Sequence, residues 1–215
     1  MNPMAHPDYV RQKAIQLRIE KKLTIDEIAE RLRLSRTTIF YWVGSIEIPE
    51  TKRQSARRLK ASKANSDRAR AKRDAAYHQG LSEFAELSKE PTFRDFVCMY
   101  IGEGFKRNRN SVAICNSDPK VVKLGNDWIK RLARNPTTYW VQHHADQDLD
   151  KLCEYWAAQL GTEPSQIKFQ RKSNSGKLSG RNWRSQYGVL TVRTGDTYLR
   201  SRLGAWMDLV KAEWD

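Results

Sequence analysis

The chain has 215 residues and a formal net charge of +14, because 39 lysines and arginines outnumber 25 aspartates and glutamates. No apolar run reaches the roughly 18 residues that a membrane span needs, the first ten residues lack the apolar core of a signal peptide, and the three cysteines form no CxxC pair. We therefore expect an intracellular protein, cytoplasmic or associated with the nucleoid, that has no membrane partner. An excess of positive charge on this scale attracts polyanions.

Residues 8–48 are predicted to form three short helices. Thr24 followed by Glu27 is a capping box, which starts the second helix, and Ser35 can cap the third. Apolar residues at three- and four-residue spacing give each helix one inward face, and Pro49 ends the segment. The sequence thus predicts a helical domain over residues 1–49.

The stretch LTIDEIAERLRLSRTTIFYWV resembles the helix-turn-helix of site-specific recombinases and related regulators. In such proteins the second helix of the motif lies in the major groove of DNA and presents side chains to base edges. The same packing also occurs in helical bundles that bind no DNA, and the pattern alone leaves that alternative open. Carried over to this chain, the candidate DNA contacts are Arg36, Thr37, Thr38, Phe40 and Tyr41.

Residues 50–79 are predicted to be a basic linker. From Lys52 to Arg73 there are ten lysines and arginines, and Asp67 is the single acid. Alanine, arginine and lysine favour a helix, but nothing here can bury a core, so we expect an arm that is mobile, or helical when it binds a polyanion. The alternative is a solvated charged helix. The candidate phosphate contacts are Arg57, Arg58, Lys60, Arg68, Arg70, Lys72 and Arg73.

Residues 80–215 are predicted to form an α+β domain, with helices on one antiparallel sheet. Helices are expected at 93–103, 118–133, 148–161 and 196–214, and strands at 111–117, 137–144, 167–170 and 187–194. Thr92 can cap the first of these helices. Trp128, Trp156 and Trp206 lie on the apolar faces of the other three, and we expect them to pack in the core instead of stacking on bases.

The segment FVCMYIGEG resembles the end of the signature helix of the LAGLIDADG family, and the resemblance extends through FK, CNSDP and YGVLTVR to DTYLRSRLGAW. In that family two such helices pack side by side, and the acid before the last glycine binds a divalent metal that faces the scissile phosphates. The matching acid is Glu103, which the resemblance implies as a catalytic residue and a ligand of Mg²⁺. Lys106 and Arg107 can neutralise a phosphate, which makes Lys106 a second catalytic candidate, or pair with this carboxylate.

The chain departs from the LAGLIDADG pattern in several places. Ile101 stands where the family often has an earlier acid, and Val97 and Cys98 stand where it has small residues for close helix packing. One copy of the motif is present, so a paired active site requires a homodimer. Glu103 is therefore either a metal ligand or a structural, vestigial acid.

The stretch from residue 168 to residue 184 has six basic residues and no acid. It is predicted to be a hairpin loop between two strands, either in contact with phosphates, since the loops that join strands in the LAGLIDADG family flank its DNA-binding saddle, or solvated without a role. The candidate contacts are Arg171, Lys172, Lys177, Arg181 and Arg184.

Together these features predict a protein that binds double-stranded DNA, in which the helix-turn-helix reads bases and the basic segments hold phosphates. Two functions follow. The first is a regulator whose LAGLIDADG-like domain has become a binding or dimerising module, and the departures at 97, 98 and 101 favour it. The second is a Mg²⁺-dependent homing-type endonuclease that acts as a homodimer. RNA binding is a third option, against which the helix-turn-helix argues, and no small-molecule ligand is evident.

Overall fold

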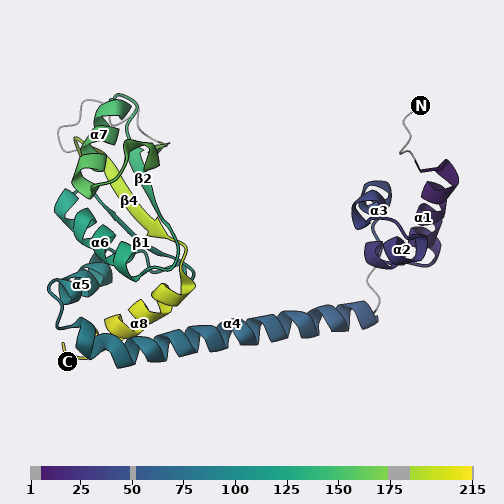
Figure 1. The fold of residues 1–215 in the computed structure, drawn as a ribbon, viewed down its shortest axis with the longest axis horizontal. Coiled ribbons are helices and arrows are strands. Elements are labelled where there is room, and N and C mark those ends of the chain that lie inside the picture. The colour runs from purple at the N-terminus through teal and green to yellow at the C-terminus, as the bar shows by residue number, and fades with distance from the viewer. Residues whose placement is uncertain (1–5, 49–51, 174–184, 215) are drawn as a thin grey trace. The chain divides into compact units, whose positions relative to one another are not determined.

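The computed structural model describes residues 6–48, 52–173 and 185–214 (Figure 1). The chain divides into two compact units, Met1–Asn65 and Ser66–Asp215, and helix α4 (Lys52–Leu87) runs across the boundary between them. Within the described ranges, no helix is long and apolar enough to span a bilayer.

The first unit contains three short helices ahead of α4, namely α1 (Asp8–Glu20), α2 (Ile25–Leu32) and α3 (Arg36–Val43). The predicted capping box is confirmed: the Glu27 amide donates to Thr24 Oγ1 at 3.2 Å, and the Thr24 amide donates to the Glu27 carboxylate at 2.8 Å. Ser35 caps α3 by accepting from the Thr38 amide at 3.1 Å. The buried apolar residues of this unit are Ala14, Leu17, Ile28, Ala29, Ile39 and Val43.

The connection between α2 and α3 is three residues long. Arg33 adopts the left-handed conformation, with φ 53°, which ends α2, and the Leu34 amide donates to the Ala29 carbonyl at 3.0 Å. A left-handed residue at the end of a helix satisfies carbonyls that the helix itself leaves open. Trp42, on the same helix as the buried Ile39 and Val43, is half-buried.

The second unit contains four further helices and a four-stranded sheet (Figure 1). The helices are α5 (Phe93–Glu103), α6 (Pro119–Leu132), α7 (Leu149–Leu160) and α8 (Thr197–Lys211). The strands are β1 (Val112–Asn116), β2 (Thr137–His143), β3 (Ile167–Arg171) and β4 (Val189–Thr194), and a short 3₁₀ turn, η1 (Pro164–Gln166), precedes β3. The unit is therefore α+β.

The prediction of an antiparallel sheet is wrong, because the sheet is mixed. Its strand order is β1-β4-β2-β3, and β4 pairs antiparallel with both β1 and β2, whereas β3 pairs parallel with β2. Helix α7 supplies the crossover that a parallel pair requires. The predicted hairpin between β3 and β4 is wrong for the same reason, since β2 lies between these two strands.

Large aromatic side chains fill the core between the sheet and its helices. The Phe93 ring lies 5.1 Å from the Trp206 ring and 5.2 Å from the Trp128 ring, and Trp156 is fully buried, so the predicted core positions of the three tryptophans are confirmed. Thr92 does not cap α5 as expected. It has φ 64°, and its hydroxyl accepts a hydrogen bond from Trp128 Nε1 at 3.1 Å.

The C-terminal part of α4 packs against α8 in the second unit. Ala76 is 1% exposed, Trp206 Nε1 donates to the Gly80 carbonyl at 3.0 Å, and Arg202 forms an ion pair with Glu83. Earlier in the same helix, every residue from 56 to 72 is exposed. From Lys52 on, the segment predicted as a linker is thus continuous helix, and its last turns are part of a folded core.

Candidate nucleic-acid interface

The outer face of α3 presents the side chains that the sequence nominated as base contacts. Arg36 and Thr37 are exposed, and Phe40 and Tyr41 are 52% and 79% exposed. Thr38 is half-buried, and its hydroxyl lies 2.8 Å from Ser35 Oγ, so it takes part in the cap of the helix. The sequence of α3 contains no acid. An exposed, acid-free helix held on a small core is suited to enter a groove of DNA.

Arg36 is engaged in the free protein. Its Nε donates to the Asp26 carboxylate at 2.7 Å, and both side chains are about 70% exposed. An ion pair in water at this exposure contributes at most about 1 kcal/mol. The Arg36 guanidinium can therefore exchange Asp26 for a phosphate or a guanine at little cost.

The basic residues of α4 lie along an exposed helix. Solvent reaches Arg57, Arg58, Lys60, Arg68 and Arg70, which fall within its exposed stretch. Lys72 and Arg73, which follow them, lie in the second unit and line a cavity there.

Glu103 is the last residue of α5, and its side chain is exposed. Among the residues that the structure describes, no group of three or more His, Cys, Asp or Glu side chains could hold a metal ion. Mg²⁺ usually takes one or two protein carboxylates together with waters and substrate phosphates. A Mg²⁺ ion held by Glu103 would therefore take most of its other ligands from waters and phosphates.

Lys106 has a structural partner that the sequence did not indicate. Its ammonium group donates to the Ile101 carbonyl at 2.6 Å, and the Tyr100 and Gly102 carbonyls lie at 3.4 and 3.5 Å. It therefore neutralises the open carbonyls at the C-terminal end of α5, where a cation is favourable. A positive charge beside Glu103 also disfavours a second cation at this helix end.

The remaining basic candidates lie at two opposite edges of the sheet. Lys106 and Arg107 follow α5 beside β1, where the Phe105 amide donates to the Ala113 carbonyl at 2.9 Å. Arg171 and Lys172 end β3 at the far edge, and the Lys172 amide donates to the His143 carbonyl at 2.9 Å. Lys177, Arg181 and Arg184 lie outside the described residues.

Between those edges lies a surface that the sequence analysis missed. The sheet face opposite the helices has a hollow of about 640 Å³, lined in part by Phe105, Trp140, Gln142, Gln170, Thr191 and Arg193. Trp140 is 38% exposed, and the Lys168 ammonium lies 5.4 Å from its ring centroid. None of the four strands contains an aspartate or glutamate. This open face combines arginine, lysine, amide and aromatic groups, which are the groups that contact phosphates and bases.

The alternation of β2 carried a signal for this face. Tyr139 and Val141 are buried, so a period of two places Thr138, Trp140 and Gln142 on the other side. The prediction assigned Trp128, Trp156 and Trp206 to the core and gave Trp140 no role.

No family model, curated protein or solved structure matches the chain.

Proposed function

We propose that the protein is a sequence-specific regulator that binds double-stranded DNA, in which α3 reads bases and the basic face of α4 holds phosphates. The observation that carries the proposal is the outer face of α3, where Arg36, Thr37, Phe40 and Tyr41 are exposed on a helix without an acid. Arginine recognises guanine through two hydrogen bonds, and threonine reaches either a base or a phosphate. The small core and the two caps fix the conformation of this helix before any ligand binds.

The exposed stretch of α4 supports a second, sequence-independent contact. Its lysines and arginines outnumber its acids ten to one between Lys52 and Arg73. Each phosphate that such a residue neutralises releases counterions, so affinity falls steeply with salt. This contact supplies affinity and positions the reader helix, and carries no base information itself.

The open face of the sheet supports a third contact, because its side chains are basic, amide and aromatic. Palindromic sites are read by two copies of a helix-turn-helix protein, so we propose that the regulator acts as a homodimer on DNA.

The test starts from a pool of random duplexes, from which the full-length protein selects its site. Fluorescence anisotropy then measures binding of the selected duplex and of a scrambled one across a salt series.

Arg36→Gln should cost about 1–3 kcal/mol of binding free energy on the selected duplex and little on the scrambled one. Arg68→Gln should weaken both duplexes alike and lower the salt slope by about 1. Arg11→Gln, an exposed arginine of α1 in the same unit, is the matched control and should leave the preference between the duplexes unchanged.

Failure to enrich any sequence, or binding that does not respond to salt, would rule the proposal out. Loss of preference in Arg11→Gln as large as in Arg36→Gln would show that general charge, and not α3, determines recognition.

The second candidate is a homing-type endonuclease acting as a homodimer. The observation in its favour is the exposed carboxylate of Glu103, two residues before Phe105 at the rim of the open face. The protein is incubated with plasmid DNA that carries the selected site, with and without Mg²⁺. Cleavage that needs Mg²⁺ and disappears in Glu103→Gln would rule out the regulator proposal in favour of the nuclease. Tight binding without nicking would rule out the nuclease.

A further inference from the structure

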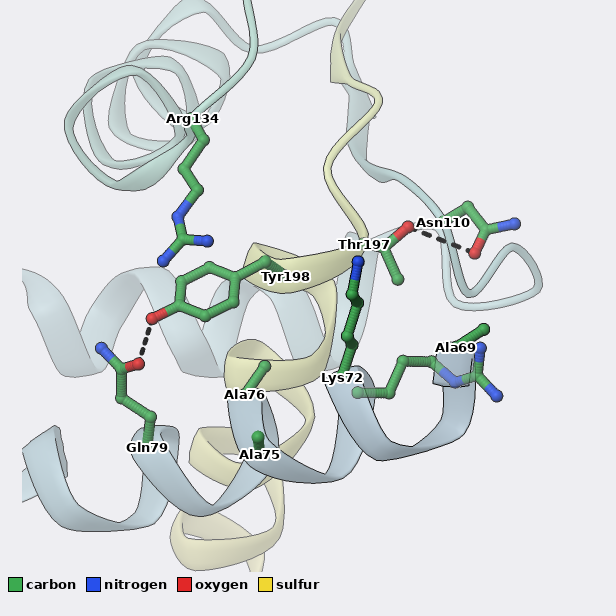
Figure 2. Close-up of a pocket in the computed structure, with 10 residues that line it drawn as sticks. Ala69, Lys72, Ala75, Ala76, Gln79, Asn110, Arg134, Thr197 and Tyr198 are labelled. Carbon is green, nitrogen blue, oxygen red and sulfur yellow. Dashed lines mark hydrogen bonds between the residues drawn. The ribbon is translucent and has the colours of Figure 1, made fainter. Parts of the chain in front are cut away.

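A cavity of about 610 Å³ lies within the second unit, against residues 69–79 of α4 (Figure 2). Its other walls come from Asn110 ahead of β1, Arg134 between α6 and β2, and Thr197 and Tyr198 at the start of α8. A volume of this size is typical of sites for small molecules, which occupy about 300–1,000 Å³. The walls come from segments far apart in the chain, so no local motif marks the site.

The floor of the cavity is an alanine face of α4. Ala69, Ala75 and Ala76 contribute only methyl groups to it, and Ala76 is almost fully buried. A helix surface of methyl groups is flat and apolar, so a planar ring can approach its backbone closely. Burial of a ring on such a surface is favourable by about 25 cal/mol for each Å² of apolar area.

Positive charge surrounds this floor, and among the residues that the structure describes no acid lines the cavity. Lys72 and Arg73 project from α4, whereas Arg134 comes from the opposite wall. In Figure 2, Arg134 approaches the Tyr198 ring from the wall opposite α4, and the Lys72 side chain rises from α4 beside Thr197. Two cations from opposite walls are suited to a phosphate, which has acceptor oxygens on several sides.

Stacking on the Tyr198 ring holds the Arg134 side chain in position. This contact uses none of the hydrogen-bond donors of the guanidinium. The guanidinium carbon lies 3.3 Å from the centroid of the Tyr198 ring, and the Tyr198 hydroxyl donates to Gln79. Stacking occupies the flat face of a guanidinium, whereas its N–H groups point outward in its plane, where they can grip a phosphate. The backbone is fixed as well, since the Arg134 amide donates to the Asp196 carboxylate at 2.7 Å.

The N-terminus of α8 does not supply the anion site. Asp196 is the cap of this helix, and its carboxylate also accepts from the Leu199 amide at 2.9 Å. The helix end is therefore already neutralised, and an anion in the cavity has to be bound by the cationic side chains.

We propose that this cavity binds a free nucleotide, with the base on the alanine face of α4 and the phosphate between Lys72 and Arg134. The positive charge of the walls favours a ligand with an anionic group. The apolar floor and the volume of the cavity favour a ligand that also has an aromatic ring system. Gln79 and Asn110 also line the cavity. Their carboxamide oxygens accept from Tyr198 and Thr197, so their amino groups are the donors that can bond to the polar edge of a base.

Isothermal titration calorimetry on the full-length protein at low salt tests the site directly. The probes are AMP, GMP, CMP and UMP, with inorganic phosphate and adenosine as its two halves. At least one nucleotide should bind about tenfold or more tightly than either half, because ring and phosphate contribute together.

Lys72→Gln and Arg134→Gln should each weaken binding of that nucleotide about tenfold or more, as expected for the loss of one charge-assisted contact. Lys130→Gln, an exposed cation of α6 outside the cavity, should change it less than about twofold.

A pair of alanine variants separates the ring from the charge. Ala69→Leu fills the cavity and should abolish nucleotide binding, whereas Ala71→Leu adds the same side chain at an exposed position of α4 outside the cavity and should not. Both positions are exposed, so both variants should fold, which circular dichroism checks.

Three results of the nucleotide titrations would overturn the proposal, and a fourth comes from a duplex. They are no binding of any of the four nucleotides, binding of inorganic phosphate as tight as that of the nucleotides, or equal effects of Ala69→Leu and Ala71→Leu. If Ala69→Leu weakened binding of a duplex as much as that of the nucleotide, the cavity would be part of a DNA surface and the free-nucleotide site would be wrong. The nucleotide titrations contain no DNA, so their outcome is independent of the regulator proposal.

Discussion

The two units of the chain are stabilised in different ways. Among the described residues, the core of the first unit has six buried apolar side chains and no aromatic one, whereas that of the second has twenty-three, of which seven are aromatic. Short helices with so little buried area depend on the hydrogen bonds at their ends, whereas a wide aromatic core depends on the fit between elements. A single substitution should therefore act on the first unit through a cap, and on the second through packing.

The same difference bears on function. The few buried residues of the first unit pack behind one exposed helix, α3, and support it. The second unit has enough core to support two concave surfaces, the open face of the sheet and the cavity beside α4. A small unit with one rigid helix is suited to reading a groove, and a larger unit with hollows is suited to holding a strand or a small molecule.

The largest expected effect on stability is that of Gly80→Ala in the second unit, and Gly102→Ala is its control. A Cβ at Gly80 would lie 2.8 Å from the Arg202 carbonyl oxygen and 2.9 Å from Ala205 Cβ, whereas a Cβ at Gly102 would meet nothing within 4 Å. Gly80→Ala should push α4 away from α8 and cost about 1–3 kcal/mol. Gly102→Ala should be neutral or stabilise the protein by up to about 1 kcal/mol, because alanine favours a helix.

Urea unfolding followed by tryptophan fluorescence measures both glycine variants, because Trp206 packs beside this contact. Amide exchange in α2 and α3 should be unchanged in Gly80→Ala. If both variants behaved alike, or if the first unit also lost protection, close packing would not be what distinguishes the second unit.

The next effect is at the cap of α2. Thr24→Ala removes the hydroxyl that accepts from the Glu27 amide and should cost the first unit about 1 kcal/mol. Amide exchange in α2 measures the loss, and Ser45→Ala, which removes an exposed hydroxyl outside the helices, is the control. Equal exchange in the two variants would show that the first unit does not depend on its caps.

The capping box also predicts a dependence on pH. The hydrogen bond from the Thr24 amide, and then that from its hydroxyl, hold the pKa of Glu27 below its ordinary value of 4.5. A carboxyl whose pKa is lowered by folding contributes stability above its unfolded pKa, and that stability is lost as the pH falls through the folded pKa. Protection of α2 should therefore decline below about pH 4.5 in the wild type, and Glu27→Gln should remove this part of the decline.

The features that the sequence predicted well are those that neighbouring residues determine. The capping box, the Ser35 cap and the Asp118-Pro119 start of α6 each lie within a few residues, and all are present. Strand positions also followed from local alternation of apolar side chains.

The errors have long-range causes. Whether β3 pairs with β2 or with β4 depends on the path of α7. The residues of the strands themselves do not indicate that path. Thr92 was nominated as a cap, but Trp128, 36 positions away, takes its hydroxyl. Val97 was treated as an obstacle to pairing of two α5 helices, yet it is fully buried inside its own unit, whereas Cys98 and Gly102 are exposed. This removes one of the reasons for preferring the regulator, and the departures at Cys98 and Ile101 remain.

The smallest expected change in stability is at the ion pair between Asp26 and Arg36, and it connects the stability of the first unit to its function. Both groups are exposed, so Asp26→Asn should alter the free energy of unfolding by less than about 0.5 kcal/mol. It should also release Arg36 and tighten binding of the selected duplex, by more than the removal of one negative charge accounts for. Glu30→Gln removes one charge from the same helix at an exposed position and gives that baseline. Equal gains in the two variants would mean that only net charge changed. Weaker binding in Asp26→Asn would mean that Asp26 holds Arg36 in the orientation that DNA needs, and that the pair is part of the reading surface instead of a competitor for it.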